Sequence, residues 1–139
     1  MEFGELTQAD VDYITKHGVS RGFFRQMPER SEWNYALRHE GITLGIGGVS
    51  LITPTTAWVW IALSEDAKSQ IYTVYRVISE WMIELVKLHH FRRLQAYTEF
   101  GFPEAELMVE HLEFKLESVM DSFIDDKPAK LWVRIFEKE

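Results

Sequence analysis

The segment Ala57-Trp-Val-Trp-Ile-Ala-Leu63, with the amphipathic pattern that follows from about Ser69 to Leu88, decides the fold. The short apolar run predicts a buried strand, and the later apolar residues at three- and four-residue spacing predict a helix. The first amides of a helix have no partner within it and its dipole favours negative charge, so such a junction can bind phosphate. The turn from Ser64 to Tyr72 contains no glycine. Whether an anion site survives there is the main functional question.

Composition limits the classes of protein to consider. With 139 residues, 46% of them hydrophobic, the chain is expected to fold as one domain over residues 1–139. A net charge of -7 argues against nonspecific binding to nucleic acid, and the basic cluster at residues 87–93 is interpreted as a helix end that complements the dipole. The absence of cysteine excludes disulfides and thiol nucleophiles. No signal peptide or membrane span is expected, so the sequence predicts a soluble, cytoplasmic protein.

An explicit helix start lies near the N-terminus. Thr7 can act as the N-cap and Asp10 stands at the capping-box position. Leu6 and Val11 are spaced to form a hydrophobic staple across that start. Gly18 is expected to stop this helix.

The remaining pattern predicts a mixed sheet with helices. The strands at 33–38, 43–52 and 57–63 read as an antiparallel meander, in which Gly45, Gly47 and Gly48 indicate a bulge or a close backbone approach. Because it follows a helix, the strand at 94–98 should run parallel to 57–63. The other predicted elements are a strand at 2–6, a short helix at 19–27 ended by Pro28, a helix starting at Pro103, and strands at 115–123 and 130–136 joined by residues 124–128.

Two further packing predictions concern apolar residues. Trp58 and Trp60 point to one face of their strand and are expected to pack against Trp81 of the long helix, or else to form an exposed aromatic groove. The strand at 131–136 is either a dimer surface at a sheet edge or an interior strand.

This order of elements resembles the GNAT (Gcn5-related N-acetyltransferase) fold over essentially the whole chain. That is an α/β (α+β) fold with a mixed, mostly antiparallel central sheet flanked by helices. Residues 57–63 fall where the family's central strand leads into its cofactor loop, and Ala105 followed by Glu110-His-Leu-Glu-Phe114 is similar to the family's late signature. The resemblance implies an N-acetyltransferase that transfers an acetyl group from acetyl-CoA to the amine of a small molecule or protein.

The cofactor loop departs from the family pattern. In the family, backbone amides of a glycine-rich loop hold the pyrophosphate, and here Ser69, Ile71 and Thr73 stand in place of the three small residues. Ile71 is the serious change, because its branched side chain restricts the backbone and fills space that glycine leaves open. Lys68 could partly offset this as a point charge. The cofactor-binding residues implied by the resemblance are Leu63, Ser64, Lys68, Ser69, Gln70, Ile71, Tyr72 and Thr73.

No catalytic side chain of the family is present by identity. Phe102 aligns with a common asparagine, Val109 with the tyrosine that often protonates the thiolate, and Glu113 with a glycine. Glu65 is the best-placed general base, with His39 and Glu40 as second choices.

Several of these polar residues also have ordinary structural roles. Dipole stabilisation would equally explain Glu65 and Asp66, and Ser64 could cap the helix or bind a ligand. His89, His90 and His111 do not form a metal-binding pattern, so no metal is predicted.

The alternative is a GNAT-fold protein that has lost catalysis and acts as a binding module. The layout is also similar to small GNAT-like proteins of short-tailed bacteriophages, in which a glycine pair like Gly47-Gly48 precedes an aromatic central strand. That similarity implies a virion-associated or host-targeting role with a protein partner. A homodimer is compatible with either reading.

Overall fold

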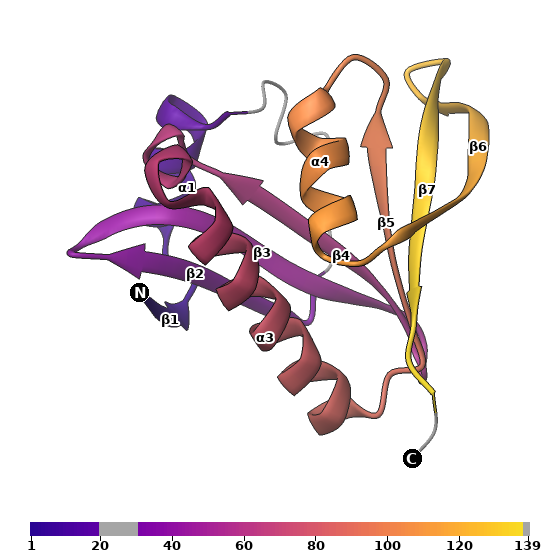
Figure 1. Ribbon diagram of the computed structural model, residues 1–139, viewed down its shortest axis with the longest axis horizontal. Coiled ribbons are helices and arrows are strands. Elements are labelled where there is room, and N and C mark those ends of the chain that lie inside the picture. The colour runs from indigo at the N-terminus through magenta and orange to yellow at the C-terminus, as the bar shows by residue number, and fades with distance from the viewer. Residues whose placement is uncertain (20–30, 138–139) are drawn as a thin grey trace. The chain divides into compact units, whose positions relative to one another are not determined.

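The computed structural model describes residues 1–19 and 31–137. Their strands form a mixed sheet in the order β1-β2-β3-β4-β5-β7-β6, with β4 and β5 parallel, which agrees with the predicted fold class (Figure 1). Residues 20–27 of the predicted second helix lie outside the described residues. The elements are β1 (Glu2–Glu5), α1 (Gln8–His17), β2 (Trp33–His39), β3 (Ile42–Thr53), β4 (Thr56–Leu63), the 3-10 helix η1 (Glu65–Gln70), α3 (Ile71–His89), β5 (Arg93–Glu99), α4 (Pro103–His111), β6 (Lys115–Ile124) and β7 (Lys127–Ile135).

The chain forms two compact units. The N-terminal unit consists of Met1–Leu51 and Val59–Val74, and the C-terminal unit of Ile52–Trp58 and Tyr75–Glu139. The first contains β1, α1, β2 and η1, and the second contains β5, α4, β6 and β7. Strands β3 and β4 and helix α3 each contribute residues to both units.

A buried carboxylate connects helix and sheet in the N-terminal unit. Thr7 and Asp10 form the predicted capping box, and Gly18 follows the last residue of α1. Asp10 is only 3% exposed and accepts hydrogen bonds from Arg38 Nε at 3.0 Å and from Thr43 Oγ1 at 2.7 Å. Arg38 lies on β2 and Thr43 on β3, so this single carboxylate ties α1 to two strands. Burial alone would raise the pKa of Asp10, but the hydrogen bonds from Arg38, Thr7 and Thr43 outweigh it and hold the pKa well below its usual 3.8.

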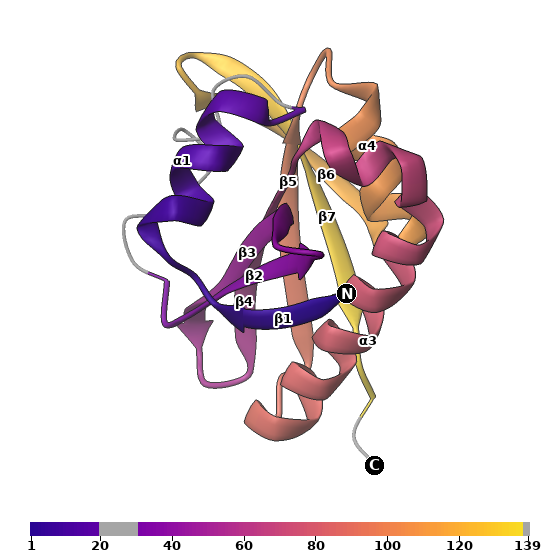
Figure 2. The same ribbon diagram turned by 90° about the vertical axis from the view of Figure 1, so that its left-hand side faces the viewer.

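The apolar core of this unit is formed by residues of α1 and of strands β2, β3 and β4. Figure 2 shows how α1 lies along these strands. Trp60 belongs to the same buried cluster as Ile14 of α1, and its predicted packing against Trp81 stays a prediction. Trp58 contacts Tyr97 and Phe123 in the C-terminal unit, with ring centroids 6.0 and 6.5 Å away. The core consists of Ile14, Ala36, Ile46, Trp60 and Ala62, with Leu6 and Val11 packed against it as the staple requires.

The glycines of β3 are explained by close approach. A Cβ added at Gly48 would lie 2.6 Å from the carbonyl oxygen of Trp33, and one at Gly47 would lie 2.8 Å from that of Trp60. The register shift between Leu37 and Arg38 also leaves Leu44 as an extra residue in β3, so a bulge lies next to Gly45. Both features that the glycines indicated are therefore present.

In the C-terminal unit, β7 lies between β5 and β6. The strand predicted at 131–136 is therefore interior, and the edge strand is β6, most of whose residues are exposed. The turn between these strands is shorter than expected, because Asp125 and Asp126 adopt positive φ and Pro128 already belongs to β7. Trp132 of β7 donates a hydrogen bond to Thr98 of β5 at 2.8 Å, and both residues are buried.

Helix α3 follows its predicted stripe except at its end. Val74, Tyr75, Ile78, Met82 and Leu85 are buried, whereas Leu88 is 69% exposed. The apolar spacing along this helix also predicts a buried Leu88, which is wrong: the helix ends one residue later, and Val86 is buried in this last turn instead.

The carboxylate of Asp10 gives a stability prediction. Asp10→Asn should lower the free energy of unfolding at neutral pH by about 2–3 kcal/mol, because Arg38 then loses its ionised partner in a buried position. Since the folded-state pKa is depressed, this contribution is complete above the usual 3.8 and is lost as the pH falls below that value. Urea unfolding measured from pH 7 to pH 3 should show a steeper loss for the wild type than for the variant. Asp12→Asn on the exposed side of α1 is the control, and equal effects of the two substitutions would contradict the assignment.

Candidate functional site

The junction between β4 and the following helix is fixed by Ser64. This residue is fully buried, and its hydroxyl donates to the carbonyl oxygens of Thr43 at 2.8 Å and Leu44 at 3.3 Å. Its amide donates to the same Leu44 oxygen at 2.9 Å. The side chain makes no capping hydrogen bond to the helix. The predicted capping role is therefore wrong, and Ser64 instead anchors the end of β4 to β3.

The helical run begins directly after Ser64, earlier than the sequence indicated. Residues Glu65–Gln70 form the 3-10 helix η1, and α3 continues from Ile71 without a break. In a 3-10 helix each amide donates to the carbonyl three residues earlier, as Ala67 does to Ser64 at 3.1 Å. The amides left over at the start of this run therefore belong to Glu65 and Asp66 and not to residues 69–73.

Both acidic side chains at this start have partners. Lys68 Nζ lies 2.9 Å from Glu65 Oε2. The hydroxyl of Tyr13 on α1 donates to Asp66 Oδ2 at 2.5 Å. That hydrogen bond, together with burial and the negative charge of Asp66, raises the pKa of Tyr13 above its usual 10.0. Residues of η1 are thus connected to α1 as well as to β3.

The predicted cofactor residues form one continuous segment of the N-terminal unit. Lys68, Ser69, Tyr72 and Thr73 are exposed, and Ile71 is half-buried. The Ser69 hydroxyl donates to the carbonyl of Asp66 at 3.3 Å. This segment presents an ammonium group and several hydroxyls to solvent, whereas the amides of residues 68–70 are used within the helix. That the segment binds a cofactor stays a prediction, and its polar side chains are the groups that can do so.

The other candidate bases lie elsewhere in this unit. His39 ends β2, and Glu40 is an exposed turn residue with φ of 51°. Glu40 and Gly41 both have positive φ, which is the geometry of a tight turn between antiparallel strands. A structural role in that turn accounts for the position of Glu40.

The three departures from the family signature lie in or next to α4. Phe102 occupies the N-cap position without a side-chain hydrogen bond, and Val109 is 4% exposed. Glu113 has φ of 66°, a left-handed conformation that favours glycine and explains why glycine suits this position. The side chains of Phe102 and Val109 carry no group that can donate a proton.

Sequence reasoning missed Tyr97 on β5. Its ring lies 6.0 Å from that of Trp58 and 5.0 Å from that of Phe123. Burial, with a smaller effect of the negative charge of Glu99, raises the pKa of Tyr97 above its usual 10.0. The hydroxyl therefore stays protonated at neutral pH and can donate. The sequence held one signal for this contact. Tyr97 lies on the same face of β5 as Gln95, and Gln95 is the register partner of Trp58.

No metal or membrane site was found in the described parts of the chain. Residues 1–19 and 31–137 hold no group of three or more histidine, aspartate or glutamate side chains that could bind a metal. Within the same residues, no helix is both long and apolar enough to cross a bilayer.

The role of Ser64 gives a testable prediction. Ser64→Ala should lower the free energy of unfolding by about 1–2 kcal/mol, because the buried hydrogen bonds to Thr43 and Leu44 are lost. Chemical unfolding measures this, and hydrogen exchange should show faster exchange at the amides of η1. Ser118→Ala on the exposed strand β6 is the control. An unchanged rate in η1 would show that Ser64 does not fix the start of the helix.

No protein-family model and no curated protein sequence matches this chain. Solved structures do match it. A GNAT family acetyltransferase from Elizabethkingia anophelis with acetyl-CoA bound is 12% identical, covers 97% of each chain and has a TM-score of 0.75. The ribosomal-protein-S18-alanine N-acetyltransferase of Escherichia coli is 15% identical over 99% of this chain and 95% of that chain, with a TM-score of 0.73.

A spermidine N-acetyltransferase variant from Vibrio cholerae is 10% identical over 97% of this chain and 95% of that chain, with a TM-score of 0.73. The predicted similarity to bacteriophage proteins has no support from these structures. Identities this low establish the fold alone. The chain therefore has the fold of the GNAT N-acetyltransferases.

Proposed function

We propose that this protein is an N-acetyltransferase that binds acetyl-CoA beside the β4–α3 junction and transfers the acetyl group to an amine. The observation that supports this most is the likeness of nearly the whole chain to N-acetyltransferases, one of which has acetyl-CoA bound. A fold hosts many activities, so the proposal also needs groups that suit the cofactor.

The polar side chains after Ser64 suit a pyrophosphate. Lys68, Ser69 and Thr73 are exposed and supply one positive charge and two hydroxyls. The ion pair of Lys68 with Glu65 is solvent-exposed and therefore weak, so it competes little with a phosphate. We infer that side chains replace the main-chain amides that a glycine-rich loop would offer. This mode of binding should be weaker and more sensitive to salt.

Glu65 is the proposed general base. Bound acetyl-CoA would supply an activated thioester, and the protein must then take a proton from the attacking amine nitrogen. The Glu65 carboxylate accepts from Lys68 in this structure and is exposed, so an amine can reach it directly or through one water molecule.

Calorimetry with acetyl-CoA tests the proposed binding site. The wild type should bind in the micromolar range at low salt, and Lys68→Glu should weaken binding at least tenfold by placing a negative charge beside the phosphates. Lys115→Glu, an equal charge change on the exposed strand β6, is the matched control and should leave the affinity within about twofold. No heat at millimolar acetyl-CoA would overturn the proposal.

Glu65→Gln separates binding from catalysis. Removal of this carboxylate takes a negative charge away from beside the proposed phosphate site, so the affinity for acetyl-CoA should stay equal or rise. Turnover should fall by about 10²–10⁴-fold, because the base is lost. Suitable acceptors for the assay are spermidine and a peptide with an N-terminal alanine, the amines named for two similar structures. If the wild type is active and Glu65→Gln has the same turnover, Glu65 is not the general base.

A GNAT-fold binding module without catalysis is the second candidate. Its support is the helical start at Glu65, which uses the amides of residues 68–70, and the buried Val109 at the position of the family's tyrosine. Acetyl-CoA binding without turnover of any amine would favour this candidate.

A further inference from the structure

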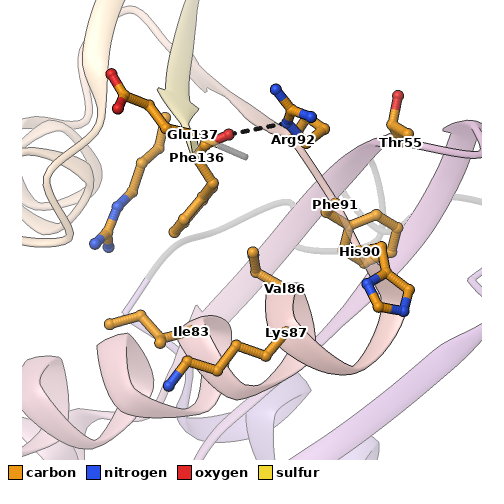
Figure 3. Close-up of a pocket in the computed structure, with 10 residues that line it drawn as sticks. Thr55, Ile83, Val86, Lys87, His90, Phe91, Arg92, Phe136 and Glu137 are labelled. Carbon is orange, nitrogen blue, oxygen red and sulfur yellow. Dashed lines mark hydrogen bonds between the residues drawn. The ribbon is translucent and has the colours of Figure 1, made fainter. Parts of the chain in front are cut away.

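The C-terminal unit contains a hollow at the C-terminal end of α3 (Figure 3). Its volume is about 940 Å³, which is within the range of about 300–1,000 Å³ that small-molecule sites occupy. Four parts of the chain enclose it: the turn between β3 and β4, the last turns of α3, the connection from α3 to β5, and the end of β7 with the residues that follow it. The lining residues are Thr55, Ile83, Val86, Lys87, His90, Phe91, Arg92, Arg134, Phe136 and Glu137.

The floor of the hollow is apolar. Val86 is 8% exposed, and Ile83 and Phe136 are half-buried. Figure 3 shows the ring of Phe136 directed toward Ile83 and Val86, while the carboxylate of Glu137 points away from them. An apolar body of several carbon atoms can therefore be desolvated on this floor.

Arg92 lies at the rim of the hollow, where hydrogen bonds fix its backbone and its side-chain Nε but not its two terminal nitrogens. Its amide donates to the carbonyl of Thr55 at 2.8 Å, and its carbonyl accepts from the amide of Phe136 at 2.8 Å. The side-chain Nε donates to the carbonyl of Phe136 at 3.3 Å. Among the described residues, the two terminal guanidinium nitrogens have no hydrogen-bond partner. These nitrogens form a planar fork that matches a carboxylate or phosphate.

The remaining charges favour an anion. The lining contains Lys87, Arg92 and Arg134 but one acidic residue, Glu137, although the whole chain carries -7. Arg134 already donates to the carbonyl of Leu112 and pairs with Glu113. Within residues 1–19 and 31–137, the one ion pair of Lys87 is an exposed contact of 4.0 Å with Glu84, which contributes little. The dipole of α3 explains Lys87 in its last turn but not Arg92, which lies beyond the helix.

The turn that separates Lys87 from Arg92 is strained at one residue. His90 has φ of 62°, where glycine is the usual residue after a helix, and Phe91 donates to the carbonyl of Val86 at 3.2 Å. A side chain kept at a left-handed position costs stability and points to a local role. His90 lines the hollow, where its imidazole adds a further donor.

We propose that this hollow binds an organic anion, with its carboxylate or phosphate on the Arg92 guanidinium and its apolar body on Ile83, Val86 and Phe136. This site is separate from the proposed acetyl-CoA segment and does not depend on it. Its ligand class is a small amphipathic acid.

The test uses 8-anilinonaphthalene-1-sulfonate, an aromatic anion whose fluorescence rises in apolar surroundings. The wild-type protein should bind it with saturation, and decanoate should displace it. Arg92→Gln and Lys87→Glu should each weaken the binding at least fivefold, because each removes positive charge at the rim. Both residues are exposed, so both variants should keep the fold, which circular dichroism checks.

Arg76→Gln, a charge removal at an exposed position on the same helix, is the matched control and should bind the probe as the wild type does. Displacement by 1-decanol as effective as that by decanoate would overturn the proposal, because the head-group charge would then contribute nothing. Equal probe affinity of the wild type and Arg92→Gln would also overturn it. Acetyl-CoA titrations of Arg92→Gln should match the wild type, so this result is independent of the proposed function.

Discussion

The local geometry of the candidate site depends on the buried serine at the end of β4. Ser64 donates its hydroxyl to Thr43 and its amide to Leu44, so the end of β4 is fixed on β3. The helical run begins directly after this anchor, at Glu65, so the free amides fall on two acidic residues. Had the helix begun four residues later, the same amides would have lain beside Lys68 and Ser69. A single buried hydroxyl thus decides which groups an anion would meet.

Buried polar groups also organise the rest of the N-terminal unit. The Asp10 carboxylate would be costly to bury alone, but Arg38, Thr7 and Thr43 donate hydrogen bonds to it. These hydrogen bonds lower its pKa by more than burial raises it. Tyr13, on the same helix, reaches Asp66 of η1. Helix α1 is therefore attached by polar contacts both to the sheet and to the segment proposed to bind acetyl-CoA. A change at α1 can affect cofactor binding without touching the cofactor.

The charges at the two ends of the long helical run have different explanations. Glu65 and Asp66 at its start and Lys87 near its end complement the helix dipole, as expected for any exposed helix. Arg92 has no such explanation, because it lies beyond the helix and keeps two nitrogens without a described partner. The residue that general helix chemistry does not account for is the one on which the proposed anion site depends.

Much of the fold follows from local pattern, and the exceptions have physical causes. The capping box at Thr7, the parallel strand β5 and the glycine contacts of β3 could be predicted because each depends on local chemistry or chain order. The packing of Trp60 on α1 and the interior position of β7 could not, since strand alternation does not specify which helix covers which face. For the site, Lys68 and Ser69 were identified from the sequence, because they follow directly after the predicted strand. In the C-terminal unit, the aromatic cluster around Tyr97 was missed, because its contacts with Trp58 and Phe123 come from distant strands.

The sequence by itself determined the order of the elements, the fold class and the polar residues that follow β4. Those features depend on periodicity and turn chemistry, which act over a few residues. Only the tertiary structure decided that Ser64 anchors β4 instead of capping the helix, and that Arg92 lies at the rim of a hollow. Both depend on hydrogen bonds to chain segments about 20 or more positions away, to Thr43 and to Phe136, which no local pattern specifies.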